Sequence, residues 1–250
     1  MTSSLSKAAI TGRVSSASAD LENELKKTIA GEVRFDDVSK QMYSTDASMY
    51  QMVPVGVVIP RDAGDVQAVL EIAGKNGVAV LPRGGGTGLS GQTVNHAVVV
   101  DFSKYMHDVI EINKEEQWVR TQPGVTIDEL NRQLKPSGLF FTPDPSTSSR
   151  ANIGGAMGNN SCGTHSIIYG KTVDHVLEMD VTLSDGTQTN FGMRDAAALE
   201  GLLRKPGLEG DIYRGVTEIS ANAANLVESK FPKILRRVGG YNIDRTQDAS

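Results

Sequence analysis

The feature that most constrains this chain is a run of glycines, GGGTGLSG, at residues 84–91. Five glycines in eight positions lose much conformational entropy on folding, so we expect another group to approach this backbone closely. The run follows an apolar stretch at residues 78–81 and precedes another at 97–100, which predicts a loop between two strands. Its free backbone N–H groups and the hydroxyls of Thr87 and Ser90 could form a nest for a pyrophosphate. An ordinary surface loop is the alternative.

The glycine run lacks the marks of two common nucleotide-binding motifs. A P-loop requires a lysine and then a serine or threonine after its last glycine, and residues 82–91 contain no lysine. A dinucleotide fingerprint opens a long helix, whereas a strand-like segment follows here. Arg83, directly before the glycines, is expected to add positive charge to the loop.

The pattern of apolar and polar residues around this loop predicts two lobes with different secondary-structure architectures. Up to about residue 102, helical and strand-like segments alternate, which favours a small, mainly parallel sheet with helices. From about residue 103, hairpin signals, a helix capped by Thr126 and an Asp185-Gly186 turn favour a larger antiparallel sheet with helices. The predicted fold class is therefore α+β, made of two α/β subdomains. Helices are predicted at residues 20–30, 62–77, 126–138 and 211–230, and strands at 55–60, 78–82, 97–103 and in pairs within 109–124 and 173–192.

A second glycine-rich stretch, residues 142–170, has almost no regular period. So long an irregular segment is uncommon inside a compact domain unless it binds something. Its bare backbone and its short serine, threonine and asparagine side chains would suit a large polar ligand. Two such segments imply a ligand long enough to reach both lobes.

Composition excludes several classes of protein. A net charge of −5 argues against general nucleic-acid binding, which needs a basic face. No apolar stretch approaches the roughly 20 residues of a membrane-spanning helix. The single cysteine, Cys162, excludes an internal disulfide framework and an all-cysteine metal cluster, and no metal site is predicted. We expect a cytoplasmic protein, with residues 1–20 a disordered terminus rather than a transit peptide.

Three motifs in order carry a family resemblance: PRGGGTGLSG, then PDPSTSSRANIGGAMGNNSCG, then YGKTVDHVLEMDVTLSDG. Together they resemble the FAD-binding domain of the p-cresol methylhydroxylase and vanillyl-alcohol oxidase superfamily. The likeness covers roughly residues 35–245 and is greatest to the branch of the glycolate oxidase subunit, D-lactate dehydrogenase and D-2-hydroxyglutarate dehydrogenase. It implies FAD lying extended between subdomains at residues 21–102 and 103–232. Residues 233–250 would begin a substrate-binding cap domain that continues beyond this chain.

The resemblance also implies which residues touch FAD. The first loop would hold the diphosphate through Arg83, Gly84, Gly85, Gly86, Thr87, Gly88, Leu89 and Ser90. The second would surround the flavin and its ribityl chain with Pro143, Ser146, Thr147, Asn152, Ile153, Gly154, Gly155, Gly158, Asn159, Cys162 and Gly163. Tyr169 and Gly170 match the family's Tyr-Gly, and Val181 lies on the strand that passes the cofactor.

Departures from the family pattern sharpen these expectations. Covalent-flavin members carry a histidine where this chain has Thr87, or a cysteine where it has Ala151, so the resemblance implies noncovalent FAD. Cys162 is expected to pack near the cofactor rather than react, because nothing cationic flanks it in sequence. His165 and His175 are expected to be structural.

The implied function is FAD-dependent oxidation of a 2-hydroxy acid, by hydride transfer from the substrate to the flavin. Candidate substrate contacts are Arg236, Arg237 and Tyr241, with a solvated chain segment as an equal alternative. No residue matches a catalytic base, and the electron acceptor is unassigned. The competing hypothesis is a noncatalytic FAD-binding module or an inactive fragment.

Overall fold

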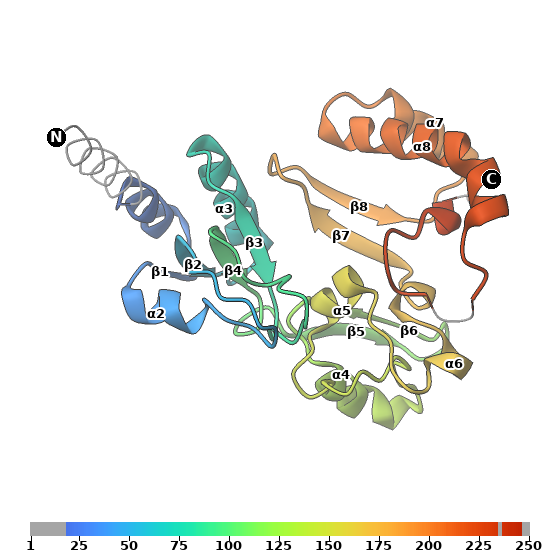
Figure 1. Cartoon of the computed structure of the whole chain (residues 1–250), viewed down its shortest axis with the longest axis horizontal. Coiled ribbons are helices and arrows are strands. Elements are labelled where there is room, and N and C mark those ends of the chain that lie inside the picture. Colours follow the sequence, from blue (N-terminus) through green and yellow to red (C-terminus); the bar gives the residue numbers. More distant parts are fainter. Residues whose placement is uncertain (1–18, 235–236, 247–250) are drawn as a thin grey trace. The chain divides into compact units, whose positions relative to one another are not determined.

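The computed structural model describes residues 19–234 and 237–246 (Figure 1). The chain divides into two compact units. The first comprises the described part of Met1–Phe140 together with Thr147–Ala156. The second comprises Phe141–Ser146 and the described part of Met157–Ser250.

The first unit is centred on a four-stranded sheet. Two central strands, β2 and β4, are parallel and entirely buried, as continuous valine-rich runs predict. β3 adds in parallel to β4, and β1 pairs antiparallel with β2. The strands are β1 (Glu32–Arg34), β2 (Gly56–Ile59), β3 (Val80–Arg83) and β4 (Val98–Asp101), in spatial order β1-β2-β4-β3.

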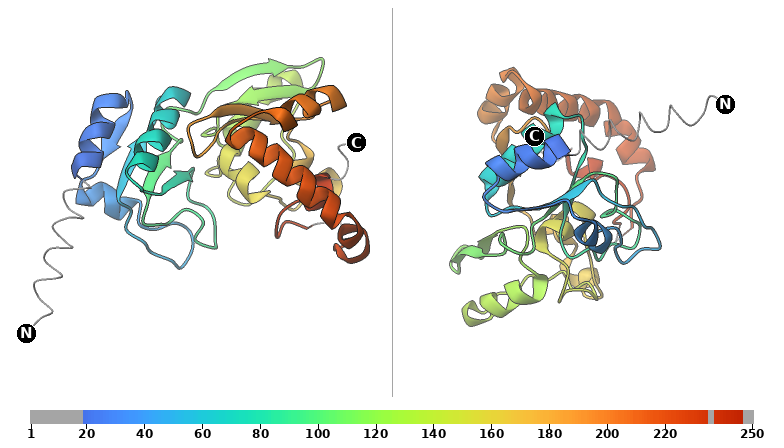
Figure 2. Two further views of the ribbon diagram at one scale, coloured as in Figure 1. Left: turned by 90° about the horizontal axis from the view of Figure 1, so that it is seen from above. Right: turned by 90° about the vertical axis from the view of Figure 1, so that its left-hand side faces the viewer.

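Two helices cover one face of this sheet. The helix of residues 19–28 and α3 (Ala63–Lys75) lie beside each other (Figure 2). Their apolar residues form one core with the strands, comprising Leu21, Leu25, Ile29, Phe35, Val58, Val69, Ile72, Val98 and Val100. Buried Asp65 ties this layer together, because its carboxylate accepts hydrogen bonds from the N–H groups of Ala30, Gly31 and Arg61. A short helix, α2 (Asp37–Met42), follows β1.

The rest of the first unit is a hairpin and a helix. β5 (Val109–Asn113) and β6 (Trp118–Thr121) pair antiparallel, and α4 (Ile127–Leu134) follows. Thr126 caps α4 by accepting a hydrogen bond from the N–H of Glu129 at 3.3 Å, as predicted. Residues 123–126 also pair with residues 151–154 through backbone hydrogen bonds, which brings the start of α5 (Ile153–Asn159) to this turn.

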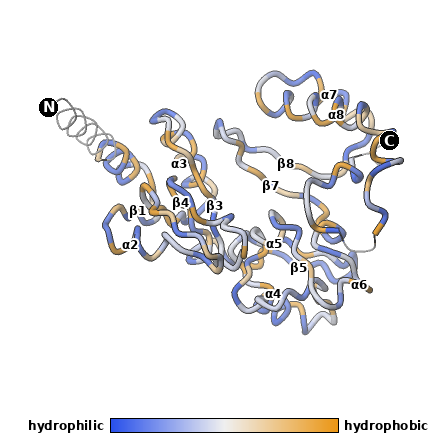
Figure 3. Tube along the Cα trace, in the orientation of Figure 1, coloured by the Kyte–Doolittle hydropathy of each residue, from blue (hydrophilic) through white to orange (hydrophobic). Residues whose placement is uncertain are grey.

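The second unit contains another hairpin and a pair of helices. Hydrophobic and hydrophilic residues alternate along its longest helix, α8 (Figure 3). The hairpin turns at Gly186, whose φ of 86° is in the left-handed region that glycine favours. Its elements are α6 (Ser166–Tyr169), a 3₁₀ turn (Thr172–Asp174), β7 (Glu178–Thr182), β8 (Gln188–Gly192), α7 (Ala196–Arg204), α8 (Leu208–Lys230) and a 3₁₀ turn (Ile243–Thr246).

The structure confirms the predicted α+β class, with some differences in detail. The antiparallel part consists of two separate two-stranded hairpins, one in each unit. The stretch 142–170, expected to be irregular, contains the short helices α5 and α6, and β1, α2 and α7 were not predicted. The β5–β6 hairpin and α4 belong to the same compact unit as the four-stranded sheet. The cofactor-binding subdomains at 21–102 and 103–232 stay a prediction.

Candidate functional site

Arg83 holds the glycine loop to the neighbouring chain. Its guanidinium donates hydrogen bonds to the backbone carbonyls of Tyr43 at 3.2 Å, Thr93 at 3.0 Å and Thr45 at 2.8 Å. It also lies 5.2 Å from the centre of the Tyr43 ring. A guanidinium has five N–H donors in a fixed plane, so these bonds commit much of it to the protein's own carbonyls.

A carboxylate strengthens the same junction. Asp46 accepts hydrogen bonds from the hydroxyl of Thr93 at 2.9 Å and the N–H of Ser48 at 2.8 Å. Burial alone would raise the pKa of Asp46, but these hydrogen bonds outweigh it and lower the pKa. The N–H of Ala47 donates to the carbonyl of Gly86 at 2.9 Å. Residues 43–48 therefore form a scaffold on which the glycine loop rests.

The first two loop glycines are required by close packing. A Cβ on Gly84 would lie 2.6 Å from Oδ1 of Asn152, and one on Gly85 would lie 2.2 Å from the carbonyl oxygen of Arg150. Both distances are far shorter than carbon–oxygen contact allows. The glycine loop and residues 150–152, distant in sequence, therefore meet backbone to backbone within the first unit.

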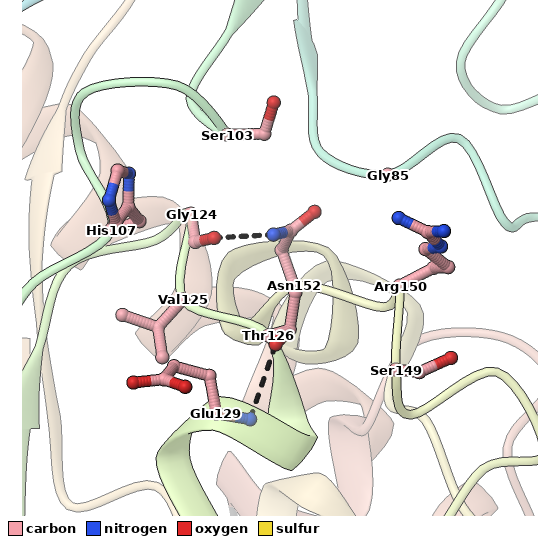
Figure 4. A pocket seen from close by; sticks show the side chains of 10 residues that line it. All are labelled: Gly85, Ser103, His107, Gly124, Val125, Thr126, Glu129, Ser149, Arg150 and Asn152. Atoms are coloured by element: carbon pink, nitrogen blue, oxygen red, sulfur yellow. Dashed lines mark hydrogen bonds between the residues drawn. The ribbon is translucent and has the colours of Figure 1, made fainter. Parts of the chain in front are cut away.

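A pocket of about 420 Å³ opens at this meeting point (Figure 4). Asn152, only 3% exposed, donates from Nδ2 to the carbonyl of Gly124, while its Oδ1 has no hydrogen-bond partner among the described residues. Hydrogen bonding to Arg132 lowers the pKa of Glu129 to about 2, so Glu129 is anionic at neutral pH. The lining residues are Gly85, Ser103, His107, Gly124, Val125, Thr126, Glu129, Ser149, Arg150 and Asn152.

The second glycine-rich stretch continues into the second unit, where another carboxylate organises it. Asp144 accepts hydrogen bonds from Nδ1 of His165 at 2.6 Å and from the N–H of the same residue at 3.1 Å. Burial alone would raise the pKa of Asp144, and these hydrogen bonds lower it. Gly163 packs so closely that a Cβ there would lie 2.1 Å from the Asp144 carbonyl oxygen. Nε2 of His175 lies 2.7 Å from the carbonyl oxygen of Tyr169, so both histidines bond to the protein itself.

Helix α5 presents glycines with a different environment. Gly155 and Gly158, three residues apart on one face of the helix, are both exposed. Apart from the adjoining residues and the helix's own backbone, no described atom lies within 4 Å of a Cβ built on either residue. The protein's own packing does not require glycine at these two positions.

The predicted site residues fall into two groups. The first unit holds residues 83–90, Thr147 and 152–155, and it brings Gly84, Gly85 and Asn152 together. The second unit holds Pro143, Ser146, Gly158, Asn159, Cys162, Gly163, Tyr169, Gly170 and Val181. Cys162 is partly buried, Gly170 follows α6 with a φ of 81°, and Val181 lies on β7.

Of the three candidate substrate contacts, Arg236 lies outside the described residues. Arg237 is paired with Asp244 at 2.6 Å and lies 4.2 Å from the centre of the Phe231 ring. Tyr241 is 95% exposed. The two described candidates thus differ, because Arg237 already has a partner whereas Tyr241 is open to solvent.

Sequence reasoning missed Arg150 and the scaffold at residues 43–48. Arg150 lies within the motif PDPSTSSRANIGGAMGNNSCG, but the family resemblance assigns it no role, and only the pocket lining identifies it. The scaffold binds Arg83 through the backbone carbonyls of Tyr43 and Thr45, which residue type does not reveal, and binds Thr93 through the side chain of Asp46.

Comparison with known families identifies the family of this chain. Residues 54–192 match the family described as FAD binding domain, and this range includes both glycine-rich segments. The chain belongs to the FAD binding domain family. The predicted family resemblance and the FAD cofactor are therefore confirmed.

Relatives of this FAD-binding chain are named D-2-hydroxyglutarate dehydrogenase and glycolate oxidase subunit GlcD. A D-2-hydroxyglutarate dehydrogenase of Pseudomonas putida is 42% identical over 221 residues, covering 87% of this chain and 22% of that protein. A glycolate oxidase subunit GlcD of Bacillus subtilis is 34% identical over 177 residues, covering 69% of this chain and 38% of that protein. The chain thus spans about a fifth of the length of the D-2-hydroxyglutarate dehydrogenase that it matches.

Solved structures agree on the fold of the FAD-binding chain. An alkyldihydroxyacetonephosphate synthase superposes with a TM-score of 0.64 at 21% identity, covering 71% of this chain and 35% of the other. p-Cresol methylhydroxylase with bound substrate gives a TM-score of 0.63 at 18% identity, covering 71% of this chain and 36% of the other. Within the described part of the chain, no helix has the length and apolar character needed to cross a membrane.

Proposed function

We propose that this chain is the FAD-binding part of a 2-hydroxy-acid dehydrogenase or oxidase, with substrates of the lactate, glycolate or 2-hydroxyglutarate type. The observation that carries the proposal is the 42% identity to a D-2-hydroxyglutarate dehydrogenase across both glycine-rich segments. When bound, FAD supplies the two-electron redox chemistry, and the protein binds and orients it. Because relatives extend well beyond the matched part, we propose that a further substrate-binding domain completes the enzyme.

The residues present fit such a cofactor. Gly84 and Gly85 let the glycine loop pack against residues 150–152, which places its backbone beside the pocket lined by Gly85, Arg150 and Asn152. The buried, unpartnered Oδ1 of Asn152 fits a ligand that carries N–H or O–H donors. We assign residues 84–90 to the diphosphate. The residues assigned to the flavin half are Pro143, Ser146, Thr147, Asn152, Ile153, Gly154, Gly155, Gly158, Asn159, Cys162, Gly163, Tyr169, Gly170 and Val181. Arg83 supports the loop from behind.

The proposed attachment of FAD is noncovalent. Thr87 and Ala151 stand where covalent relatives carry a histidine or a cysteine, and neither side chain can form such a link. Arg237 and Tyr241 remain candidate contacts for a substrate carboxylate, and the cytoplasm remains the proposed location. We assign no catalytic base and no electron acceptor.

Reconstitution tests this proposal. The purified 250-residue chain is incubated with FAD, separated from free cofactor, and examined for flavin absorbance. Bound FAD released intact by acid precipitation supports the noncovalent assignment, whereas flavin that stays with the precipitate contradicts it. Absence of bound flavin would contradict the proposal altogether.

A second measurement separates an enzyme from a binding module. D-lactate, glycolate and D-2-hydroxyglutarate are added anaerobically to the FAD-loaded chain, and bleaching of the flavin is followed. Bleaching by one of them supports oxidoreductase activity in this chain. If the flavin stays yellow with all three acids, the hypothesis that this chain only binds FAD is favoured. Turnover would then require the proposed further domain.

A further inference from the structure

Two arginines flank the glycine loop, and only one of them is free. Arg83 donates to three backbone carbonyls. Arg150 is exposed, lines the pocket beside Gly85, and has no side-chain hydrogen bond or ion pair across residues 19–234 and 237–246 (Figure 4). The cation available to a ligand at this loop is therefore Arg150.

The same pocket contains a buried acceptor that lacks a donor. Nδ2 of Asn152 donates a hydrogen bond to the carbonyl of Gly124. This bond sets the orientation of the amide and leaves Oδ1 as the atom without a hydrogen-bond partner among the described residues. A buried polar atom without a partner destabilises a protein, so such atoms normally meet a water or a ligand. Oδ1 can only accept, and the matching ligand group is a hydroxyl or an N–H.

The opposite wall restricts where negative charge can lie. Figure 4 shows His107 and Glu129 across the pocket from Arg150. Glu129 is anionic and is paired with Arg132, whose Nε donates to it at 2.8 Å, so its carboxylate offers a ligand acceptors rather than donors. A ligand with an anionic end therefore fits with that end towards Arg150 and Gly85.

We propose that this pocket takes a sugar or polyol phosphate, with Arg150 binding the phosphate oxygens and Oδ1 of Asn152 accepting a hydrogen bond from a hydroxyl. FAD contains this chemistry twice, in its ribityl phosphate and in its ribose phosphate. The proposal rests on FAD binding by this chain. It assigns the pairing cation to Arg150, to which the family resemblance gives no role, and leaves Arg83 a positioning residue.

The test compares Arg150→Gln with Lys114→Gln, which removes an equal charge from the exposed tip of the β5–β6 hairpin. Calorimetric titrations use FAD, FMN, ADP and riboflavin. Loss of a charge-assisted hydrogen bond to phosphate lowers affinity by about 10- to 100-fold. We expect Arg150→Gln to show this loss for FAD, Lys114→Gln to bind as wild type does, and riboflavin, which lacks phosphate, to be unaffected by either change.

The fragments identify the source of the phosphate. A loss for FMN alone places the ribityl phosphate at Arg150, and a loss for ADP alone places the ribose phosphate there. If wild type binds FAD and Arg150→Gln matches Lys114→Gln for all ligands, the pocket assignment is wrong while FAD binding stands. If wild type binds no FAD, the proposed function fails as well.

Asn152→Ala tests the hydroxyl contact, with apo melting recorded first because Nδ2 also supports the fold. We expect weaker binding of the affected sugar phosphate and unchanged binding of inorganic pyrophosphate, which has no sugar hydroxyl. Equal losses for both probes would contradict the role of Oδ1. If the variant does not fold, the Arg150 titrations decide the proposal.

Discussion

The two glycine-rich segments of this chain use glycine for opposite reasons. In the loop at 84–91, a Cβ on Gly84 or Gly85 would collide with atoms of Asn152 or Arg150, so the fold itself demands glycine. In α5, apart from the adjoining residues and the helix's own backbone, a Cβ on Gly155 or Gly158 would meet no described atom within 4 Å. Glycine in a helix costs about 1 kcal/mol relative to alanine, and nothing in the protein's own packing offsets that cost here.

The difference separates scaffold from open surface. Gly84 and Gly85 contact other parts of the protein and allow the glycine loop to pack against residues 150–152. Gly155 and Gly158 touch no neighbouring segment and lie in a stretch proposed to bind FAD, so they leave the backbone of α5 open to a ligand. Substitutions at the two kinds of position should therefore fail in different ways.

The largest effect is expected for Gly85→Val. Its Cβ would lie 2.2 Å from the carbonyl oxygen of Arg150, and this backbone group cannot move aside without disturbing the pairing of residues 151–154 with residues 123–126. We expect a loss of about 3 kcal/mol in the free energy of unfolding, and FAD binding lost with the fold. Denaturant unfolding of the apo protein measures this.

Gly155→Val is the matched comparison. Its side chain enters open space, so apo stability should stay within about 0.5 kcal/mol of wild type while FAD affinity falls. If both variants kept the wild-type fold, the distinction between the two segments would be wrong.

The next effect concerns the support of the loop. Arg83→Lys keeps the charge but cannot reach three carbonyls with one ammonium group. Losing charge-assisted hydrogen bonds should lower stability by about 1.5 to 3 kcal/mol. In hydrogen–deuterium exchange of the apo protein, residues 84–91 should exchange faster. Wild-type exchange in Arg83→Lys would show that charge alone suffices and that the carbonyl bonds do not position the loop.

The sequence predicted most elements of the first unit because its signals are local. Valine-rich runs marked β2 and β4, helical spacing of apolar residues marked α3, and the Thr126 cap marked α4. β1, with three residues, is too short to show a period. The helix α5 escaped because its sequence, IGGAMGN, contains three poor helix formers, and the pairing of residues 151–154 with 123–126 overrides propensity.

The candidate site was predictable as chain segments and not as geometry. Density of glycine in two places located both segments without the structure. That Arg83 faces carbonyls while Arg150 lines the pocket depends on contacts between residues far apart in sequence. Residue type alone gives the two arginines the same role.

A smaller effect tests the open face of α5. Gly155→Ala should stabilise the apo protein by about 0.5 to 1 kcal/mol through helix propensity. The added methyl should also lower FAD affinity about tenfold where the ligand touches backbone. Gly201→Ala in α7, another exposed glycine with no described atom near its Cβ, is the control and should stabilise without changing FAD affinity. Equal FAD affinity in both variants would remove α5 from the cofactor site.

The smallest effect uses the two carboxylates that hold the segments, Asp46 and Asp144. Hydrogen bonds lower the pKa of each below its usual 3.8, which means that the folded state favours the charged form. Their contribution to stability is therefore full above pH 3.8 and lost as the pH falls through the lowered pKa values. In Asp46→Asn, the free energy of unfolding should depend less on pH in this acidic range. Unfolding is monitored by the fluorescence of Trp118, which lies in the same unit. Asp144 belongs to the other unit, so Asp144→Asn should leave the Trp118 transition unchanged and shift only the unfolding transition followed by helical circular dichroism. Because the Asp144 side chain is 38% exposed, this shift should be smaller than the shift that Asp46→Asn causes. If Asp46→Asn and Asp144→Asn changed the Trp118 transition equally, the two glycine-rich segments would unfold in one cooperative step. The two segments would then differ only in how closely a ligand can approach their backbone.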